Sequence, residues 1–290
     1  MGNTRAALLM IFSMAFFAVA DAFVKFGSTY MSVAVLLILM SVPSALVFAF
    51  LAQRAGQPPI SPLLWSRKVV LRNFIEGIAA ICVVSALANG ELSLVIALLQ
   101  GVPLFVTIGA ALMLKEHVGP RRWIAVAIGF FGVLLMLRPD ADGVSVGALF
   151  AVGAAMALSS RDLITRTMPQ NVGTFQLATW GTAVLILAGL LLMPFTGPHA
   201  LPSLPGWGFA LLASAFNAIG YYAITAAMRS GDVSYVTPFR YTRLVFALIL
   251  AVLFFNERPD ALTLVGAAIV IGSGLFVMWR ERNANVNANS

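Results

Sequence analysis

Charge is scarce in this sequence of 290 residues. Asp, Glu, Lys and Arg together make up 10% of it, whereas a soluble domain carries about 25% because its surface must face water. Hydrophobic residues account for 60%. Such a chain cannot cover its own core with polar side chains, so a soluble globular protein is excluded. Because apolar side chains can face outward in lipid, the composition predicts an integral membrane protein in contact with a lipid bilayer.

Cysteine and histidine are nearly absent. The one cysteine, Cys82, cannot form an internal disulfide or a multi-cysteine metal site, and in its apolar segment we expect it to pack as a small hydrophobic residue. The two histidines, His117 and His199, are far apart in expected loops. The patterns H-E-x-x-H, G-x-S-x-G and G-x-x-x-x-G-K-[ST] are missing. The sequence therefore predicts no metal, no cofactor and no catalytic residue, and it excludes a pump driven by its own Walker motif.

Basic residues outnumber acidic ones by 18 to 11, which gives a formal net charge of +7 and an isoelectric point of about 10.2. In a soluble protein this excess would suggest a nucleic-acid partner. Here the Lys and Arg residues lie between apolar segments and form no stripe, so we expect no nucleic acid to bind. The oligomeric state is left open by the sequence.

Ten apolar segments are long enough to cross a membrane, which takes about 20 residues. Charged residues, Gly or Pro bound each of them. The predicted fold is all-α, with ten transmembrane helices. We expect these helices at 6–25, 31–51, 69–88, 93–114, 121–138, 145–167, 173–193, 206–228, 233–255 and 262–279. The Asn-rich tail 283–290 is expected to be disordered.

The two halves of the chain resemble each other when the sequence is shifted by 141 residues. The shift defines a first repeat, 1–142, and a second repeat, 143–282, with five expected helices each. Because five is an odd number, the second repeat must enter the membrane from the opposite side, which is the inverted-repeat plan of many transporters. The matched pairs are Asp21 with Asp162, Lys25 with Arg166, Glu76 with Asn217, Gly90 with Gly231, and Glu116 with Glu257.

The positions of the basic residues predict the orientation. With the N-terminus inside, 13 Lys and Arg residues fall at cytoplasmic helix ends and only three, Lys25, Arg138 and Arg258, at outer ends. This asymmetry satisfies the positive-inside rule. We therefore expect a multi-pass protein of the cytoplasmic (inner) membrane with both termini in the cytoplasm.

Arg240 and Arg243 are the charges that stand out, because they lie inside the ninth apolar segment. Arg243 would lie roughly 15 Å along a helix that starts near Val233. A spacing of three puts both side chains on one face, where they could bind a substrate carboxylate with paired hydrogen bonds. The alternatives are a salt bridge to Glu76, or an Arg240 side chain that reaches back to the cytoplasmic interface.

Polar residues form stripes on several of the expected helices, and these stripes must face the interior of the bundle in lipid. We expect them to line a wet substrate cavity; the alternative is hydrogen bonding between helices. A buried Glu76 could also carry a coupled proton. The candidate substrate-binding residues are Arg240, Arg243, Glu76, Asn217, Tyr221, Tyr241, Gln100, Asn73 and Ser214, and Thr225 continues the stripe of the eighth segment.

Several other patterns have structural interpretations. Pro103 and Pro238 are expected to kink their helices near the middle, which often marks a binding site but also occurs for packing reasons. The remaining patterns are acid–base pairs at i, i+4 (Asp21 with Lys25, Asp162 with Arg166), helix-capping carboxylates (Glu116, Glu257) and small residues for close packing (Ala125 with Gly129, Ala268 with Gly272).

Loose motifs in both halves resemble the EamA repeat of the drug/metabolite transporter superfamily. In the first half these are Gly101-Val102-Pro103-Leu104, Leu114-Lys115-Glu116, Trp123-Ile124-Ala125 and Gly129 to Gly132. In the second half they are Thr237-Pro238, Asn256-Glu257-Arg258 and Gly266 to Gly274. The resemblance covers nearly the whole chain. Asn256 departs from the Gly that the family often has there, and the two arginines of the ninth segment are not a general family feature.

The resemblance implies a secondary transporter, not an enzyme, that exports or exchanges amino acids and related amphiphilic metabolites by alternating access through a central cavity. A likeness to the aromatic amino acid exporter branch (the YddG type) has no diagnostic motif to carry it. The competing interpretations are a membrane enzyme acting on lipid or prenyl substrates, and a structural or sensory subunit that moves no solute. The substrate, the direction of transport and the coupling ion are not fixed by the sequence.

Overall fold

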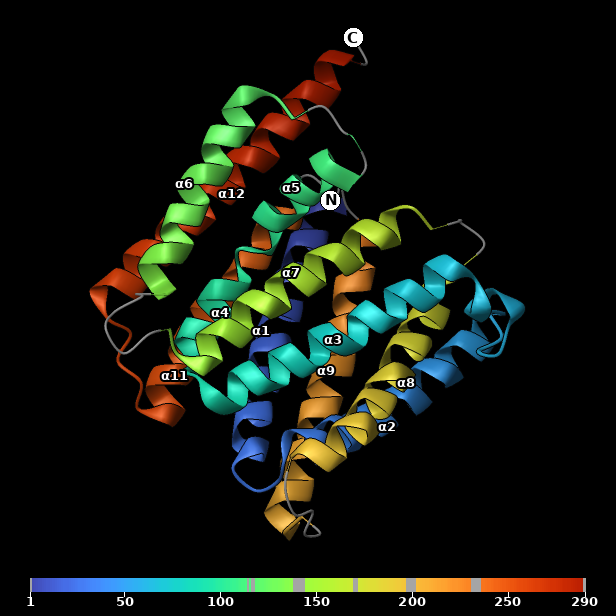
Figure 1. Cartoon of the computed structure of the whole chain (residues 1–290). Helices are drawn as coiled ribbons and strands as arrows, with labels where there is room; N and C mark the ends of the chain where they lie inside the picture. Colours follow the sequence, from blue (N-terminus) through green and yellow to red (C-terminus); the bar gives the residue numbers. More distant parts are fainter. Residues whose placement is uncertain are drawn as a thin grey trace.

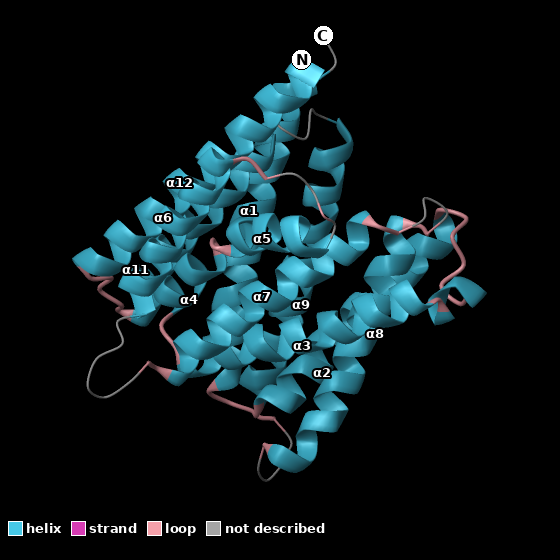
Figure 2. Ribbon diagram, turned by 45° about the horizontal axis from the view of Figure 1, so that its top comes forward, coloured by secondary structure: helices cyan, strands magenta, loops and turns pink. Residues whose placement is uncertain are grey.

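The structure is a computed structural model, and it describes residues 2–113, 115, 118–137, 144–168, 172–196, 202–230 and 236–288. Within these residues the secondary structure is helical, and ten helical stretches are long and apolar enough to cross a membrane (Figures 1 and 2). This confirms the predicted all-α, ten-span fold. The elements are α1 (Gly2–Ser28), α2 (Val33–Arg54), η1 (Pro62–Trp65), α3 (Arg67–Asn89), α4 (Leu92–Leu99), α5 (Val102–Met113), α6 (Pro120–Leu137), α7 (Val146–Arg166), α8 (Thr174–Leu192), η2 (Met193–Phe195), α9 (Leu204–Ser230), η3 (Thr237–Tyr241), α11 (Thr242–Phe255) and α12 (Ala261–Ala288).

Short polar residues set the starts and ends of these helices. The Ser145 hydroxyl accepts a hydrogen bond from the Ala148 amide at the start of α7, at 3.2 Å, and Asp260 does the same for Thr263 at the start of α12, at 2.8 Å. Each satisfies an N–H group that has no partner within its helix. Asn256 ends α11 with a left-handed backbone, φ 52°, which Asn tolerates better than most residues. At its other end α12 continues through Ala288, so most of the tail expected to be disordered extends this helix, because adding a turn to an existing helix is inexpensive.

The fourth and ninth spans are both interrupted. The fourth consists of α4 and α5, which are separated at Gln100 and Gly101. Pro103 lacks an N–H group and so cannot donate to the Leu99 carbonyl, as a continuous helix would require. The ninth passes through the 3₁₀ segment η3 and becomes α-helical at Thr242, which is the repeat equivalent of Gly101. The predicted interruptions are therefore present, and they occur at matching places in the two repeats.

The helices pair in a pattern that is unchanged when the two repeats are exchanged. The exchange turns α1 into α7 and α3 into α9, so the extensive α1–α9 contact becomes the extensive α3–α7 contact. The pairs α2–α8 and α6–α12 each join equivalent helices, and they lie on opposite sides of the bundle in Figures 1 and 2. Together with five spans in each half, this pattern supports an inverted, two-fold-related arrangement of the repeats.

Close helix packing uses only part of the expected small residues. Ala125 and Gly129 are buried, and a Cβ on Gly129 would meet Leu104 and Ser273. The expectation for Ala268 and Gly272 was wrong, because both are exposed and nothing lies within 4 Å of a Cβ on Gly272. The α12 face that packs on α6 instead carries Gly266, which would meet the Gly132 carbonyl. The spacing of small residues was right, but the helix presents another face to its partner.

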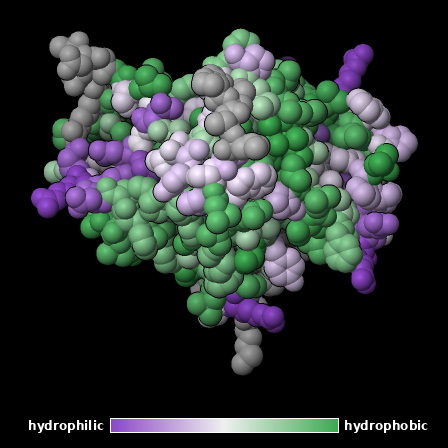
Figure 3. Space-filling view, turned by 90° about the horizontal axis from the view of Figure 1, so that it is seen from below, coloured by the Kyte–Doolittle hydropathy of each residue, from purple (hydrophilic) through white to green (hydrophobic). Residues whose placement is uncertain are grey.

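The outer surface is apolar over wide areas. Figure 3 shows hydrophobic side chains over much of the surface seen from below, with hydrophilic side chains in separate patches. Leu46, Leu191 and Leu253 are each at least two-thirds exposed. In water this surface would aggregate, whereas in a bilayer it faces lipid tails.

Candidate functional site

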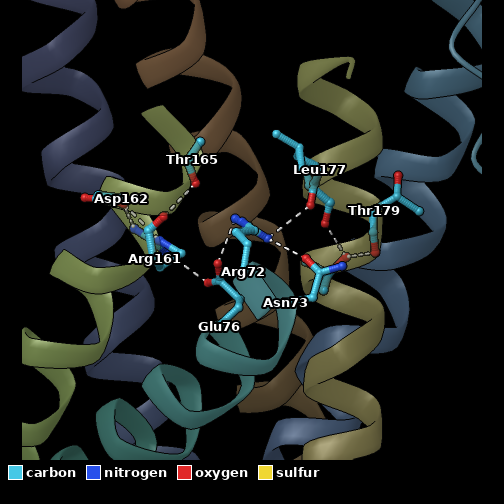
Figure 4. Close-up of polar contacts among 10 residues, drawn as sticks. Arg72, Asn73, Glu76, Arg161, Asp162, Thr165, Leu177 and Thr179 are labelled. Atoms are coloured by element: carbon cyan, nitrogen blue, oxygen red, sulfur yellow. Dashed lines mark hydrogen bonds and ion pairs between the residues drawn. The ribbon is translucent and has the colours of Figure 1, made fainter. Parts of the chain in front are cut away.

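The bundle interior holds a chain of charged side chains from α3 and α7 (Figure 4). Glu76 lies between two arginines, with Arg72 Nη2 at 2.7 Å and Arg161 Nη1 at 3.0 Å. Arg161 also binds Asp162 through two nitrogens, at 2.7 and 2.9 Å. These ion pairs lie within membrane-spanning helices, where each charge needs a partner because lipid does not solvate it. They link the third helix of the first repeat to the first helix of the second.

A second ion pair joins α1 to α11. Both oxygens of Asp21 accept hydrogen bonds from Arg243, with distances of 2.6, 2.8 and 3.0 Å. The Arg243 guanidinium also lies over the ring of Phe17, 5.5 Å from its centre. The planar fork of arginine fits a carboxylate in this two-point geometry. Arg243 therefore has an acid partner within the protein, Asp21, which the sequence had not assigned to it.

Arg240 differs from the other arginines of the interior. It lies in η3, just before the helical part of the ninth span, and it feels the charges of Asp162, Arg161 and Arg243. Its side chain is nevertheless exposed, and among the described residues it makes no hydrogen bond or ion pair. A charged group at membrane depth that is exposed and unpaired must contact water, the membrane interface or a ligand. Among the described residues of this region, Arg240 is thus the arginine without an ion-pair partner.

The charges of this region do not balance. Four arginines (Arg72, Arg161, Arg240, Arg243) face three acids (Asp21, Glu76, Asp162), so the formal sum is 4 − 3 = +1. Within the described part of the chain, Arg240 is the member of the set without an acid as ion-pair partner. We call these seven residues the charge cluster. Its surplus positive charge would be neutralised by a bound group with one negative charge.

Two further predicted residues lie at the helix interruptions with polar atoms that have no partner. Gln100 and Tyr241 are repeat equivalents, and both are buried. The Gln100 Nε2 atom and the Tyr241 hydroxyl make no hydrogen bond with the described residues. A buried polar group without a partner costs free energy. The Tyr241 hydroxyl also presses against Gly274, where a Cβ would overlap it.

The remaining predicted residues divide between helix packing and the charge cluster. Ser214 is buried and shares a hydrogen bond of 2.8 Å with Ser44, which joins α9 to α2. Asn73 is buried and accepts a hydrogen bond from Arg72 Nη1 at 3.0 Å. Tyr221 lies near Arg72, Glu76 and Arg161. Asn217 is half-buried one turn before Tyr221.

The expected i, i+4 ion pair of Asp21 with Lys25 was wrong, while that of Asp162 with Arg166 involves a side chain outside the described residues. Asp21 binds Arg243 and Lys25 binds Glu257, while Asp162 binds its neighbour Arg161. A local pair on a helix gains only a few tenths of a kcal/mol, so partners from other helices that exclude water replace it. Glu116, Arg138 and both histidines lie outside the described residues, as do the side chains of Arg166 and Thr225.

Glu257 caps the start of a helix, as predicted, but it caps a different helix from the one expected. Its carboxylate accepts N–H groups at the start of α4 in the other repeat, whereas we had expected the start of the following helix. Sequence reasoning also missed Arg72 and Arg161 as interior residues, because it assigned both to cytoplasmic helix ends. One signal was available, since Arg72 and Glu76 stand at the i, i+4 spacing that favours pairing.

The structure outlines two surface hollows of about 400 and 440 Å³, and neither includes a member of the charge cluster. The first lies on α11, around Leu248 and Leu253, and the second around Trp65 and Phe74. Among the described residues no group of three or more His, Cys, Asp or Glu could hold a metal ion.

Comparison with known proteins gives matches over most of the chain. The sequence profile of the EamA-like transporter family matches residues 4–138 and 145–279. A riboflavin transporter of Rhizobium johnstonii is 33% identical over 200 residues, which are 68% of this chain and 65% of that protein. An S-adenosylmethionine uptake transporter of Rickettsia bellii is 27% identical over 63% of this chain and 62% of its own length. The matched part thus spans just under two thirds of these curated relatives.

Two other matches extend over nearly the full length. The pseudopaline exporter CntI of Pseudomonas aeruginosa is 26% identical over 273 residues, 91% of this chain and 92% of that protein. A solved crystal structure shares 18% identity and superimposes with a TM-score of 0.63, covering 97% of this chain and 99% of the other. At that identity the solved structure supports the fold alone.

Proposed function

The chain belongs to the EamA-like transporter family of the drug/metabolite transporter superfamily, and we propose that this secondary transporter holds its solute at the guanidinium of Arg240. The family and the names of the relatives indicate a membrane transporter and not an enzyme. The observation that carries the proposal is the exposed, unpaired Arg240 beside ion-paired neighbours. A guanidinium in that state offers several N–H donors in one plane, which suit a carboxylate.

The proposed substrate is a small organic metabolite that presents a carboxylate and carries one net negative charge. Such a solute would neutralise the surplus charge of the cluster, whereas a solute with two net negative charges or a net positive charge would leave an unbalanced charge in a region of low dielectric constant. An acidic amino acid has this net charge, because its two carboxylates outnumber its one ammonium group. The relatives are named for riboflavin, S-adenosylmethionine and pseudopaline, so the class of small polar metabolites is shared while the particular solute differs.

Transport by alternating access is supported by the symmetry of the helix pairs. An exchange of the two repeats maps the α1–α9 contact onto the α3–α7 contact. Two repeats related in this way can adopt each other's conformations, which exposes a site between them first on one side and then on the other. The charge cluster includes residues of α1 and α3 from the first repeat and of α7 and α11 from the second. It therefore lies between the repeats, where alternating access would expose it to each side in turn.

The proposed location is the cytoplasmic membrane, with both termini inside. Arg72 and Arg161 lie within spans and belong to ion pairs, so they no longer count as cytoplasmic end charges. Removing them changes the ratio of inner to outer basic residues from 13:3 to 11:3, since 13 − 2 = 11. The asymmetry remains large enough to favour this orientation.

Counterflow into proteoliposomes would test the site. The panel would contain riboflavin, S-adenosylmethionine, and acid–amide pairs such as glutamate with glutamine and aspartate with asparagine. For the solute that wild type carries, Arg240→Gln is expected to lower uptake by about tenfold or more, because it removes a charge-assisted pair of hydrogen bonds. Within a pair, the acid, which has one net negative charge, is expected to inhibit uptake of the transported solute more strongly than its amide, which has no net charge.

The matched control is Arg54→Gln, which makes the same change at an exposed residue at the end of α2. It should leave uptake close to wild type. If Arg240→Gln transports like Arg54→Gln at equal amounts of protein, the site assignment is wrong. If no solute moves with wild type while the protein is folded, the choice of substrate class is wrong.

A further inference from the structure

A second cluster of charges lies away from the proposed solute site, where three segments meet. Glu257 belongs to the turn between α11 and α12 and is buried. Its two carboxylate oxygens accept hydrogen bonds from the Leu92 amide at 2.7 Å, the Ser93 amide at 3.0 Å and the Ser93 hydroxyl at 2.7 Å. These amides belong to the first turn of α4, where N–H groups lack partners within the helix. A carboxylate there also meets the positive end of the helix dipole.

Lys25 completes this cluster from the end of α1. Its ammonium lies 3.3 Å from Glu257 Oε1 and donates to the carbonyl of Gly90, in the turn that precedes α4. It also lies 5.3 Å from the centre of the Phe255 ring. The end of α1, the α3–α4 turn and the α11–α12 turn are thereby tied together. We call Lys25, Leu92, Ser93 and Glu257 the clasp.

The helix that the clasp contacts, α4, is tightly packed within the bundle. Seven of the eight residues of α4 are buried, and Figure 1 shows α4 beside α11, with which it is in contact. Next to the clasp, the backbones of Gly90 and Gly147 approach so closely that a Cβ on either would meet the other. At its far end α4 stops at Gln100, where the fourth span is interrupted. The clasp therefore holds the end of α4 that lies opposite to the interruption.

The contacts of the clasp cross from one repeat to the other. Glu257 belongs to the second repeat, whereas Lys25 and the start of α4 belong to the first. A motion that rotates one repeat against the other must separate these groups, whereas a contact within one repeat would survive it. In alternating access, the end of the molecule that carries these contacts must open in one of the two states.

We propose that Glu257 is a positioning residue that keeps this end of the carrier closed by holding the start of α4, and that releasing it opens the path to the solute site. This inference rests on the alternating access proposed above. Under the orientation favoured by the charges, the clasp closes the extracytoplasmic end. A carboxylate is required because the donors of α4 and the ammonium of Lys25 use both of its oxygens, whereas an amide side chain has one acceptor oxygen and an NH2 group that only donates.

Thiol labelling tests the clasp without any solute. The chain has a single cysteine, so Cys82→Ser gives a cysteine-free background. Val95→Cys then places a reporter one turn below the clasp, at a residue that is fully buried and faces Gly90. A membrane-impermeant maleimide is added to one side of the vesicles at a time. With the clasp intact we expect slow labelling from either side.

Removing the clasp should speed labelling from one side. For Glu257→Gln and for the milder Lys25→Gln we expect rates about tenfold higher, because a hydrogen-bonded charge pair is lost. The matched control is Glu91→Gln, an exposed acid next to α4 whose side chain makes no capping hydrogen bond, and it should label like the parent. Unchanged labelling in both Glu257→Gln and Lys25→Gln would overturn the proposal.

The exchanged pair Lys25→Glu with Glu257→Lys separates a clasp from a simple ion pair. The exchange restores opposite charges, but a lysine at 257 cannot accept the amides of α4, so fast labelling should persist. Slow labelling in the exchanged protein would show that the amide contacts do not matter and would contradict the assignment. Because the assay needs no solute, a negative result here leaves the solute site untouched, and a failed transport assay leaves the clasp untouched.

Discussion

The fourth and ninth spans are interrupted at equivalent positions, but the side chains that flank the two interruptions differ in charge. The interruption of the first repeat is flanked by Leu99 and Val102, while the equivalent positions of the second repeat are Arg240 and Arg243. Leu99 is buried in the main apolar core, whereas Arg240 is exposed. A symmetric scaffold therefore carries an asymmetric site. The symmetry suits a protein that alternates between two related conformations, and the asymmetry restricts the binding chemistry to one interruption.

The largest effect is expected from giving the first interruption the chemistry of the second. Leu99→Arg places a charge at a residue that is 7% exposed, and we expect it to destabilise the fold by about 3 kcal/mol or more because an unpaired charge is buried. The reverse change, Arg240→Leu, removes an exposed side chain without a partner and should leave the fold intact. Thermal unfolding of the purified proteins measures both, and similar unfolding temperatures for the two variants would contradict the comparison.

A smaller effect is expected at the next pair of equivalent residues, Glu76 and Asn217. Glu76→Gln leaves Arg72 and Arg161 with one acid fewer between them, so we expect about 3 kcal/mol of destabilisation at most, since the site is not fully desolvated. Asn217→Ala removes a half-buried amide that makes no hydrogen bond with the described residues, and it should cost less than about 1 kcal/mol. Equal losses of thermal stability in Glu76→Gln and Asn217→Ala would contradict the expected difference between the two repeats.

The smallest effect concerns packing at the second interruption. Gly274→Ala would place a methyl group against the Tyr241 hydroxyl, and we expect a loss of about 1–3 kcal/mol from overpacking. Tyr241→Phe removes a hydroxyl that has no partner, so it should be nearly neutral alone and should rescue Gly274→Ala. Unfolding of the two single variants and the double variant measures this coupling. Additive effects would mean that the two residues do not press on each other.

Much of the fold could be predicted from the sequence because its signals are local. Apolar segments of about 20 residues and the constant offset between the halves are enough for ten spans in two repeats. The interruptions near Pro103 and Pro238 follow from the missing N–H group of proline, which can be read from the sequence. These features do not depend on knowing which helices touch.

The site was only partly predictable because its partners come from distant segments. Asp21 binds Arg243, which is 222 residues away, whereas the i, i+4 rule had assigned it to Lys25. Arg72 and Arg161 stand near the ends of apolar segments, and only the packing of α3 on α7 shows that they turn inward. Arg240 was identified from its depth, but its freedom from any ion pair depends on where the three acids found their partners.

The central claim is that Arg240 binds the anionic group of the solute. The most direct test is the thermal unfolding of wild type and Arg240→Gln, each with and without the solute that wild type transports. A ligand that binds the folded state raises the unfolding temperature, so we expect the solute to raise that of wild type and to have little effect on Arg240→Gln. Equal increases in both proteins would contradict the account.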